Sequence, residues 1–183
     1  MTSLETGRNL RPGQRLSRAT FSTTLNSQHG RSVTGYVDNY ETCERTLAEL
    51  RIYSNVIAPT EISRRLGLRP SSSVEKGQVP AVTRTGRSNV GQTNSWILSS
   101  DGKMTSRDAR RHLDWLLDQL EPVKAELVVL QDTNDVQMHV MCIWWSAFGH
   151  GGPIFWPSEL LRLSALNLEL EIDFAHFGSE PNQ

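Results

Sequence analysis

The sequence predicts an α+β fold: a mostly antiparallel or mixed sheet with helices packed mainly on one face. Short segments alternate apolar and polar residues with period 2, which is typical of half-buried strands. Apolar residues at helical spacing occupy stretches between these segments, and Gly, Pro and Ser separate the two kinds. The predicted order is β-α-β-α-β-β-α-β along a chain of 183 residues, a length that suits one domain.

The first predicted strand, residues 47–54, follows a polar and basic N-terminal segment, residues 1–46, which we expect to be flexible. Along the strand, apolar and polar side chains alternate, as in a strand with one buried face. The apolar residues are Ala48, Leu50 and Ile52, and the polar ones are Glu49, Arg51 and Tyr53. The polar set is therefore expected on an open face of the sheet.

Two helices and a second strand are predicted in the middle of the chain. Pro59 in a first turn and Gly67 at an end predict a short helix. A long loop, residues 69–94, separates it from a strand at residues 95–99. Apolar residues at helical spacing then predict the longest helix, which is expected to end before Pro122.

Residues 125–145 are predicted to form the central hairpin of the sheet. Two apolar runs, residues 127–130 and 136–145, flank the sequence DTND at residues 132–135. This composition is typical of a turn between antiparallel strands. The second run becomes apolar on both faces, which indicates a strand in the middle of its sheet or covered by another layer.

The last predicted strand, residues 168–174, has one acidic face. It follows a Gly-rich turn, residues 149–153, and a short helix opened by Pro157. Apolar residues alternate in it with Glu169, Glu171 and Asp173, which therefore share one side. Residues 47–177 are thus predicted as a single α+β domain, with residues 178–183 as a short tail.

Aromatic residues concentrate around the Gly-rich turn. Trp144 and Trp145 are adjacent in a predicted strand, so they point to opposite faces. Core packing explains Trp144. We expect Trp145 to line an exposed apolar patch of the kind that anchors a protein partner.

Charge is unevenly distributed, although the formal net charge is -1. Residues 1–111 carry 17 Lys and Arg against 9 Asp and Glu, whereas residues 112–183 carry Lys124 and Arg162 against 11. This asymmetry indicates an acidic surface for a basic partner, unless the two halves interleave and the charges mix. Two cysteines and the lack of a long apolar run predict a reduced, cytoplasmic protein with no membrane contact.

No cofactor or metal site is predicted. His139 and Cys142 fall on opposite faces of a strand, so they cannot bind one ion there. The sequence GRSNVGQT, residues 86–93, has Gln92 where a P-loop has lysine. The segment HGG, residues 150–152, lacks the Gly-x-Ser-x-Gly nucleophile turn that accompanies it in esterases.

Several stretches of the chain also carry a resemblance. They are LRIYSNVIAPTEISRRLGLRPSSSVEKG, NSWILSS, LDWLLDQLEPVKAEL and GGPIFWPSELLRLSALNLELEIDF. The most specific part is a strand followed by Pro-x-Glu-Ile, Leu-Gly-Leu-x-Pro and Lys-Gly. From about Leu47 to Phe174 the chain resembles the bacterial family catalogued as domain of unknown function 4279. The resemblance implies a cytoplasmic α+β domain, brings no catalytic residues with it, and suggests immunity or other interaction proteins.

The residues leave several functions open. The first is a non-catalytic protein-interaction domain, most specifically an immunity-type protein that neutralises a basic cognate toxin. Its expected partner-binding residues are Glu49, Arg51, Tyr53, Trp145, Glu169, Glu171 and Asp173. The alternative is a small-molecule-binding domain or small enzyme between residues 69–94 and 149–153, using Arg84, Arg87 and His150. A nucleic-acid binder that uses the basic N-terminal segment ranks last.

Overall fold

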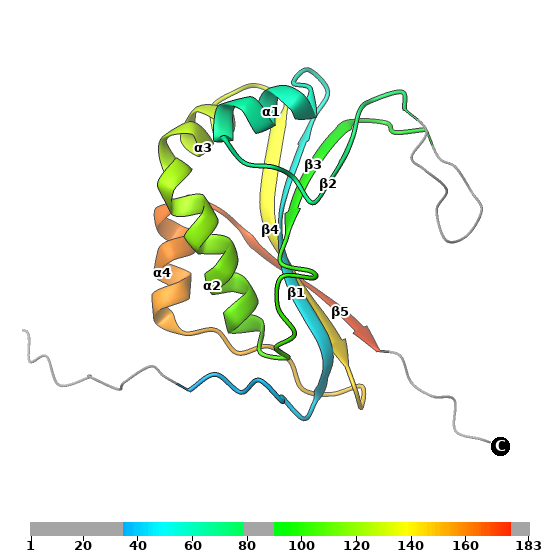
Figure 1. The fold of residues 1–183 in the computed structure, drawn as a ribbon, viewed down its shortest axis with the longest axis vertical. Helices are drawn as coiled ribbons and strands as arrows, with labels where there is room; N and C mark the ends of the chain where they lie inside the picture. The colour runs from blue at the N-terminus through cyan, green and yellow to red at the C-terminus, as the bar shows by residue number, and fades with distance from the viewer. Residues whose placement is uncertain (1–34, 79–89, 177–183) are drawn as a thin grey trace, which may run out of the picture. The chain divides into compact units, whose positions relative to one another are not determined.

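Five strands form one mixed sheet in the order β2-β3-β1-β4-β5 (Figure 1). The computed structural model describes residues 35–78 and 90–176. The pairs β2–β3, β3–β1 and β1–β4 are antiparallel, and β5 joins β4 in parallel. The strands are β1 Cys43–Ser54, β2 Ser72–Val74, β3 Asn94–Ser99, β4 Val136–Ser146 and β5 Leu170–His176.

Helices lie on one face of this sheet, which confirms the predicted α+β class. Figure 1 shows α2, α3 and α4 together on one side of the strands, with α1 near α3 at one end. The opposite face carries no helix of the described residues. The helices are α1 Pro59–Leu66, α2 Ala109–Leu120, α3 Lys124–Gln131 and α4 Pro157–Ala165, with a 3-10 turn, η1 Glu121–Val123, between α2 and α3.

The long central strand β1 follows the predicted alternation. Ala48, Leu50 and Ile52 are fully buried on the helix side, because every second side chain points to the same face. β1 begins at Cys43 rather than at Leu47, so the expected boundary of the domain falls inside a strand. Most of the N-terminal segment that we expected to be flexible lies outside the described residues.

The predicted central hairpin is wrong in its first half. Residues 124–131 form helix α3, not a strand. Leu127 and Leu130 are fully buried, whereas Val128 and Val129 between them are 39% and 51% exposed. A short apolar run fits a strand or a helix equally well by periodicity. Pro122 does not stop the helical path, because it lies at the start of η1, where its missing N–H is not needed.

The core lies between the sheet and the helices. Buried side chains of β1, β3 and β4 pack against those of α2 and α3, and Trp96 of β3 is the largest of them. Its indole Nε1 donates to Ser63 Oγ of α1 at 2.9 Å, so the polar atom of this side chain is satisfied. The cluster also contains Leu50, Ile52, Leu113, Leu116, Leu120, Leu127, Leu130 and Val140.

The predicted loop of residues 69–94 contains a strand. Ser72–Val74 form β2, which pairs with β3 at the edge of the sheet, and residues 79–89 lie outside the described residues. The propensity signal is weak because β2 has only 3 residues, two of them serine. No helix among residues 35–78 and 90–176 has both the length and the apolar character needed to cross a membrane.

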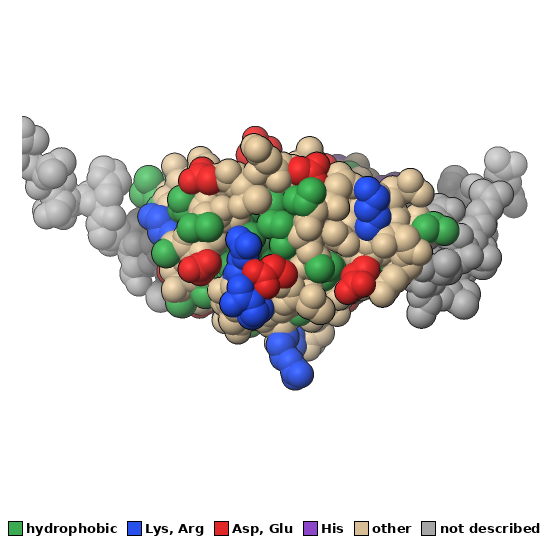
Figure 2. Space-filling model, turned by 90° about the horizontal axis from the view of Figure 1, so that it is seen from above, with side chains coloured by type: hydrophobic (Ala, Val, Ile, Leu, Met, Phe, Trp, Pro, Cys, Tyr) green, Lys and Arg blue, Asp and Glu red, His purple; other side chains and the backbone are tan. Residues whose placement is uncertain are grey.

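Charges of both signs lie close together at the end of the molecule that carries α1. Figure 2 shows acidic, basic and apolar side chains interspersed there. Within α1, Glu61 pairs with Arg64 and Arg65 at 2.7 and 2.8 Å. The charge asymmetry of the sequence therefore does not make this end of the molecule a patch of one sign.

Candidate functional site

The strand register defines the side chains on the sheet face opposite the helices, which we call the uncovered face. Directly paired residues of neighbouring strands point to the same face. Glu49, for example, pairs with Met141, which in turn pairs with Glu171. The rows across this face are Val74–Ser95–Tyr53–Gln137, Ser72–Ile97–Arg51–His139, Ser99–Glu49–Met141–Glu171, Leu47–Ile143–Asp173 and Arg45–Trp145–Ala175.

The uncovered face brings together the expected partner-binding residues, except Glu169. They come from three strands: Glu49, Arg51 and Tyr53 from β1, Trp145 from β4, and Glu171 and Asp173 from β5. The residues of β1 and β5 are not direct neighbours, because β4 lies between the two strands. The face therefore has an acidic margin at β5 that is separated from the charges of β1.

The centre of the uncovered face is apolar. Leu47 and Met141 are only 4% and 6% exposed although no described helix covers them. Ile143 and Trp145 beside them are half-buried. The guanidinium of Arg45 lies 5.0 Å from the centre of the Trp145 ring, a cation–π arrangement. The Trp145 ring thus lies at the surface, in contact with a charged group.

Charged groups around this centre are only partly neutralised. Arg51 and Glu49 form an ion pair of 2.7 Å within β1. His139 stacks on Tyr53 with ring centroids 6.2 Å apart, and its Nε2 lies 3.5 Å from Glu171 Oε2. Among the described residues, no lysine or arginine forms an ion pair with Glu171 or with the other acids of β5.

Arg162 does not neutralise β5 because it is engaged elsewhere. It is one of only two basic residues after residue 111. Its guanidinium binds Asp114, Asp118 and Glu121 at 2.8, 2.6 and 2.6 Å in the helical layer. The hydrogen bonds with Glu121 and, less strongly, with Asp118 raise the pKa of Arg162 above its ordinary value. Arg162 is therefore not available to pair with the acids of β5.

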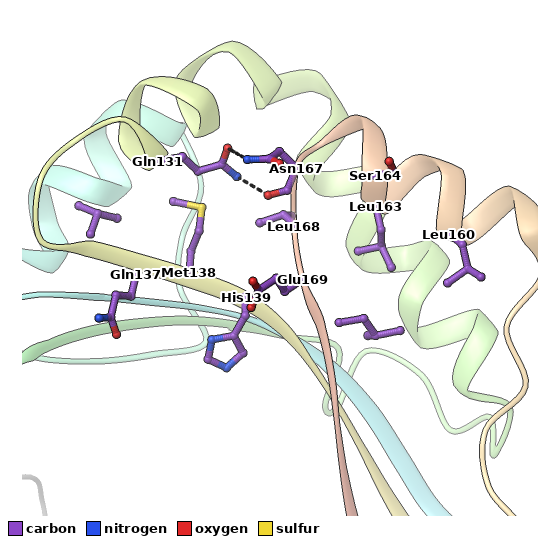
Figure 3. A pocket seen from close by; sticks show the side chains of 12 residues that line it. Gln131, Gln137, Met138, His139, Leu160, Leu163, Ser164, Asn167, Leu168 and Glu169 are labelled. Carbon is purple, nitrogen blue, oxygen red and sulfur yellow. Dashed lines mark hydrogen bonds between the residues drawn. The ribbon is translucent and has the colours of Figure 1, made fainter.

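A groove of about 740 Å³ lies where β4 extends beyond its pairing with β5 (Figure 3). Pairing begins at Val140, so Val136–His139 is the open part of β4. The Gln131 side chain donates to the carbonyl oxygens of Leu166 and Asn167 and so holds the opposite wall. Sequence reasoning missed this groove, because its lining residues come from separate elements. They are Gln131, Val136, Gln137, Met138, His139, Leu160, Leu163, Ser164, Asn167, Leu168, Glu169 and Leu170.

Glu169 lines this groove and lies outside the register that pairs β5 with β4. It directly precedes β5, and its carbonyl oxygen accepts the Val140 N–H at 2.8 Å. Figure 3 shows its side chain close to the open part of β4, near His139. The expected acidic set is thus divided between the groove and the margin of the uncovered face.

A Ser–His pair occurs in the core and was not expected from the sequence. Ser100 Oγ and His112 Nδ1 are 2.8 Å apart, and His112 Nε2 lies 2.8 Å from the Ser106 carbonyl oxygen. The carbonyl can only accept, so Nε2 carries the proton and Nδ1 accepts from the hydroxyl. Ser100 and His112 are 0% and 2% exposed, and burial lowers the pKa of His112. Closed to substrate, this pair is structural.

A buried charged cluster ties α2 to α4. Asp108 caps α2 by accepting the Arg110 N–H at 3.0 Å and binds the Arg110 guanidinium at 2.8 Å. Arg110 in turn lies 4.1 Å over the Trp156 ring. Burial alone would raise the pKa of Asp108, but hydrogen bonds from Arg110 and from the Val37 N–H lower it. Glu159 is 1% exposed, and burial raises its pKa to about 7.

This cluster also anchors the chain before β1. Tyr36 donates its hydroxyl to Asp114 Oδ2 at 2.6 Å, and the Val37 N–H donates to Asp108 Oδ2 at 2.7 Å. The Tyr36 ring lies 4.2 Å from the Arg111 guanidinium. These contacts give the cluster a structural role, because each of its carboxylates except that of Glu159 has cationic partners.

The alternative pocket is not formed by the described residues. The Gly-rich turn follows the end of β4 that pairs with Cys43, whereas residues 90–94 adjoin the end of β1 at Ser54. His150 is exposed at the turn and stacks on Phe148 with centroids 6.0 Å apart. Arg84 and Arg87 lie outside the described residues. His150 is therefore at the opposite end of the sheet from the described part of that loop.

Close packing explains Gly151 in the turn. Gly151 has a φ of 81°, and a Cβ there would lie 2.5 Å from Thr42 Oγ1. The turn therefore needs glycine to reverse the chain against the start of β1. Within residues 35–78 and 90–176, no group of His, Cys, Asp and Glu side chains has the arrangement of a metal site.

Comparison with known proteins identifies one family. The model of a domain of unknown function, DUF4279, matches residues 41–176. The match extends from just before β1 to the end of β5, so it includes the whole sheet and all the described helices. No curated protein and no solved structure matches the chain.

Proposed function

The chain belongs to the DUF4279 family, and we propose that this member is a non-catalytic protein-interaction domain. It binds a basic protein partner through the uncovered face of its sheet. The observation that carries the proposal is the combination of a partly exposed apolar pair, Ile143 and Trp145, with an acidic margin at Glu171 and Asp173. These acids have no lysine or arginine partner among the described residues.

The two parts of this face have different physical roles in binding. Half-buried side chains such as Trp145 and Ile143 lose little further conformational freedom on binding, so they suit the desolvated centre of an interface. Carboxylates at a margin attract a basic partner before contact and so raise the association rate. This division of an apolar pair from a charged margin supports a binding surface.

The most specific form of the proposal is an immunity-type protein that neutralises a cognate basic toxin. Such a protein acts by occluding its target, so it needs surface complementarity and no reacting groups. Co-expression with the toxin should then restore growth. The charge-reversed variant Glu171→Lys/Asp173→Lys should lose this protection while it remains folded, because both side chains are exposed.

The test is capture of a partner from the native host, followed by kinetic measurement with the purified pair. We expect a stoichiometric basic partner whose association rate falls at least about ten-fold between low salt and 0.5 M salt. Glu171→Lys/Asp173→Lys should produce a similar fall at low salt. The matched control is Glu126→Lys/Asp132→Lys, which reverses two acids at α3 and its C-terminal end, away from the uncovered face.

Two results would contradict the proposal. One is a partner that associates at the same rate with the wild-type protein and with Glu171→Lys/Asp173→Lys. The other is an equal loss of rate in the α3 control, since net charge alone would then explain the effect. Circular dichroism and thermal unfolding of each variant establish that the fold is intact.

A further inference from the structure

The outer edge of β5 presents unpaired backbone groups. β5 is the last strand in the order β2-β3-β1-β4-β5. The Val140 N–H binds the carbonyl of Glu169, and successive residues of a strand direct their backbone groups to alternate edges. The backbone groups of Glu171 therefore point toward β4, while those of Ile172 and Phe174 point outward. No other described strand pairs with this edge.

The two faces of β5 differ sharply in chemistry. Ile172 and Phe174 lie on the side of the sheet that carries the helices, yet they are 48% and 44% exposed. Glu171 and Asp173 lie on the uncovered face and are also exposed. An added strand would therefore meet an apolar row on one side and an acidic row on the other.

Acidic side chains disfavour a second copy of the chain at this edge in most antiparallel registers. If two copies of β5 paired antiparallel about Ile172, Glu171 would lie opposite Asp173 of the other copy. Pairing centred on Glu171 would place Glu171 opposite Glu171 of the other copy. Pairing centred on Asp173 would place Asp173 opposite Asp173 of the other copy. Like charges directly opposite each other destabilise a strand pair. Charge complementarity instead favours a strand with lysine or arginine at every second position.

We propose that β5 accepts an extended segment of the partner as an additional strand. Apolar side chains of this segment contact Ile172 and Phe174, and its alternating Lys or Arg side chains lie over Glu171 and Asp173. This inference rests on the proposed function and names the binding mode. Backbone hydrogen bonds at the edge contribute affinity, and the alternating side chains contribute specificity.

The other edge of the sheet provides an internal control. β2 has only 3 residues, and Ser72 and Ser73 are exposed serines without charge. It offers neither an acidic row nor enough length for a stable pairing. A basic alternating segment should therefore select β5 over β2, although both strands end the same sheet.

The experiment titrates ¹⁵N-labelled full-length protein with acetyl-Val-Lys-Val-Lys-Val-Lys-Val-amide, a probe as long as the 7 residues of β5. We expect amide shift changes along β5 and none along β2. Two further probes carry N-methyl groups on backbone nitrogens: one probe on those of all its valines, the other on those of all its lysines. At least one should bind about ten-fold more weakly, because methylation removes the donors that one edge of the probe uses. Retention of binding by both would overturn strand addition.

Charge exchange provides the second criterion. The wild-type protein should prefer the lysine probe to the same peptide with glutamate in place of lysine. Glu171→Lys/Asp173→Lys should reverse this preference. A wild-type protein that binds both probes equally, or that forms a dimer through β5 in analytical ultracentrifugation, would overturn the assignment of a basic strand.

Failure of the binding mode is distinguishable from failure of the proposed function. If a captured partner requires Glu171 and Asp173 but both methylated probes bind normally, the function stands and strand addition fails. If the lysine probe pairs with β5 but no basic partner shows charge-dependent association, the edge is competent for pairing and the proposed function fails.

Discussion

The two faces of the sheet are built on different principles. On the helix side of β1, Leu50 and Ile52 are fully buried, and the ion pair of Asp108 with Arg110 is almost fully enclosed in the helical layer. On the uncovered face, the ion pair of Arg51 and Glu49 keeps 23% and 14% of its side chains exposed. The same strand thus contributes to a sealed core on one side and to a solvated surface on the other.

This difference indicates how stability and function are separated in the molecule. Apolar burial and the enclosed charges of the helical layer hold the sheet in place. The uncovered face can then vary in charge and shape at little cost to folding, which suits a binding surface. Substitutions on the two faces should differ accordingly in their effect on the free energy of unfolding.

The largest difference is expected between the two ion pairs. Asp108→Asn should lower the free energy of unfolding by about 4 kcal/mol, because it leaves the Arg110 charge buried without its partner. Glu49→Gln should cost about 1 kcal/mol or less, since solvent reaches the Arg51 guanidinium. Urea denaturation of both variants at pH 7 measures the contrast. Equal costs would show that the uncovered face is as sealed as the helical layer.

A smaller difference is expected between two leucines of β1. Leu50→Ala should cost about 3 kcal/mol, because the surrounding core cannot close the cavity. Leu47 is also buried, at 4% exposure, but lies on the uncovered face. Leu47→Ala should cost about half as much, since its neighbours can move and water is close. If Leu47→Ala were as costly as Leu50→Ala in urea denaturation, another layer would have to cover that face.

The third expected effect is a pH dependence confined to the helical layer. Burial raises the pKa of Glu159 from 4.5 to about 7 in the folded protein. Its stabilising contribution is therefore full below pH 4.5 and is lost as the pH rises through 7. Glu159→Gln should remove this loss, of about 3 kcal/mol. Urea denaturation from pH 4.5 to 8 measures it, and an unchanged pH dependence would contradict the assignment.

His112 should act in the opposite direction and provides the comparison. Burial lowers its pKa below the ordinary 6.5, so its contribution is full above that pH and is lost as the pH falls toward the folded value. His112→Gln should flatten the acid side of the stability profile, whereas Glu159→Gln flattens the neutral side. Stability profiles that moved in the same direction in the two variants would contradict one of the two pKa shifts.

Local patterns predicted the elements that alternate clearly or end at clear punctuation. In β1 every second side chain is apolar, and α1 has Pro59 at its start and Gly67 in the left-handed conformation at its end. The strand predicted at residues 127–130 was wrong because so short an apolar run does not distinguish helical from strand periodicity. Tertiary contacts determined the helical state of this segment, because Leu127 and Leu130 pack into the core cluster when the chain continues from α2 as a helix.

The composition of the candidate site could be anticipated, but its arrangement could not. Period-2 spacing put Glu49, Arg51 and Tyr53 on one side of a strand, and Glu171 and Asp173 on one side of another. No local signal states that β4 separates these strands or that β5 enters in parallel. The groove beside Glu169 depends on that register as well, since the pairing of β4 with β5 begins only at Val140 of β4.

The order of residues was thus sufficient for the α+β class, the family, the alternation of β1 and the acidic row of β5, because each depends on neighbours in the chain. Strand order, the helical state of residues 124–131, the burial of Ser100 with His112 and the open edge of β5 depend on contacts between distant segments. Such contacts form because they bury apolar area and satisfy buried polar groups. Both quantities depend on the complete fold and not on neighbouring residues of the chain.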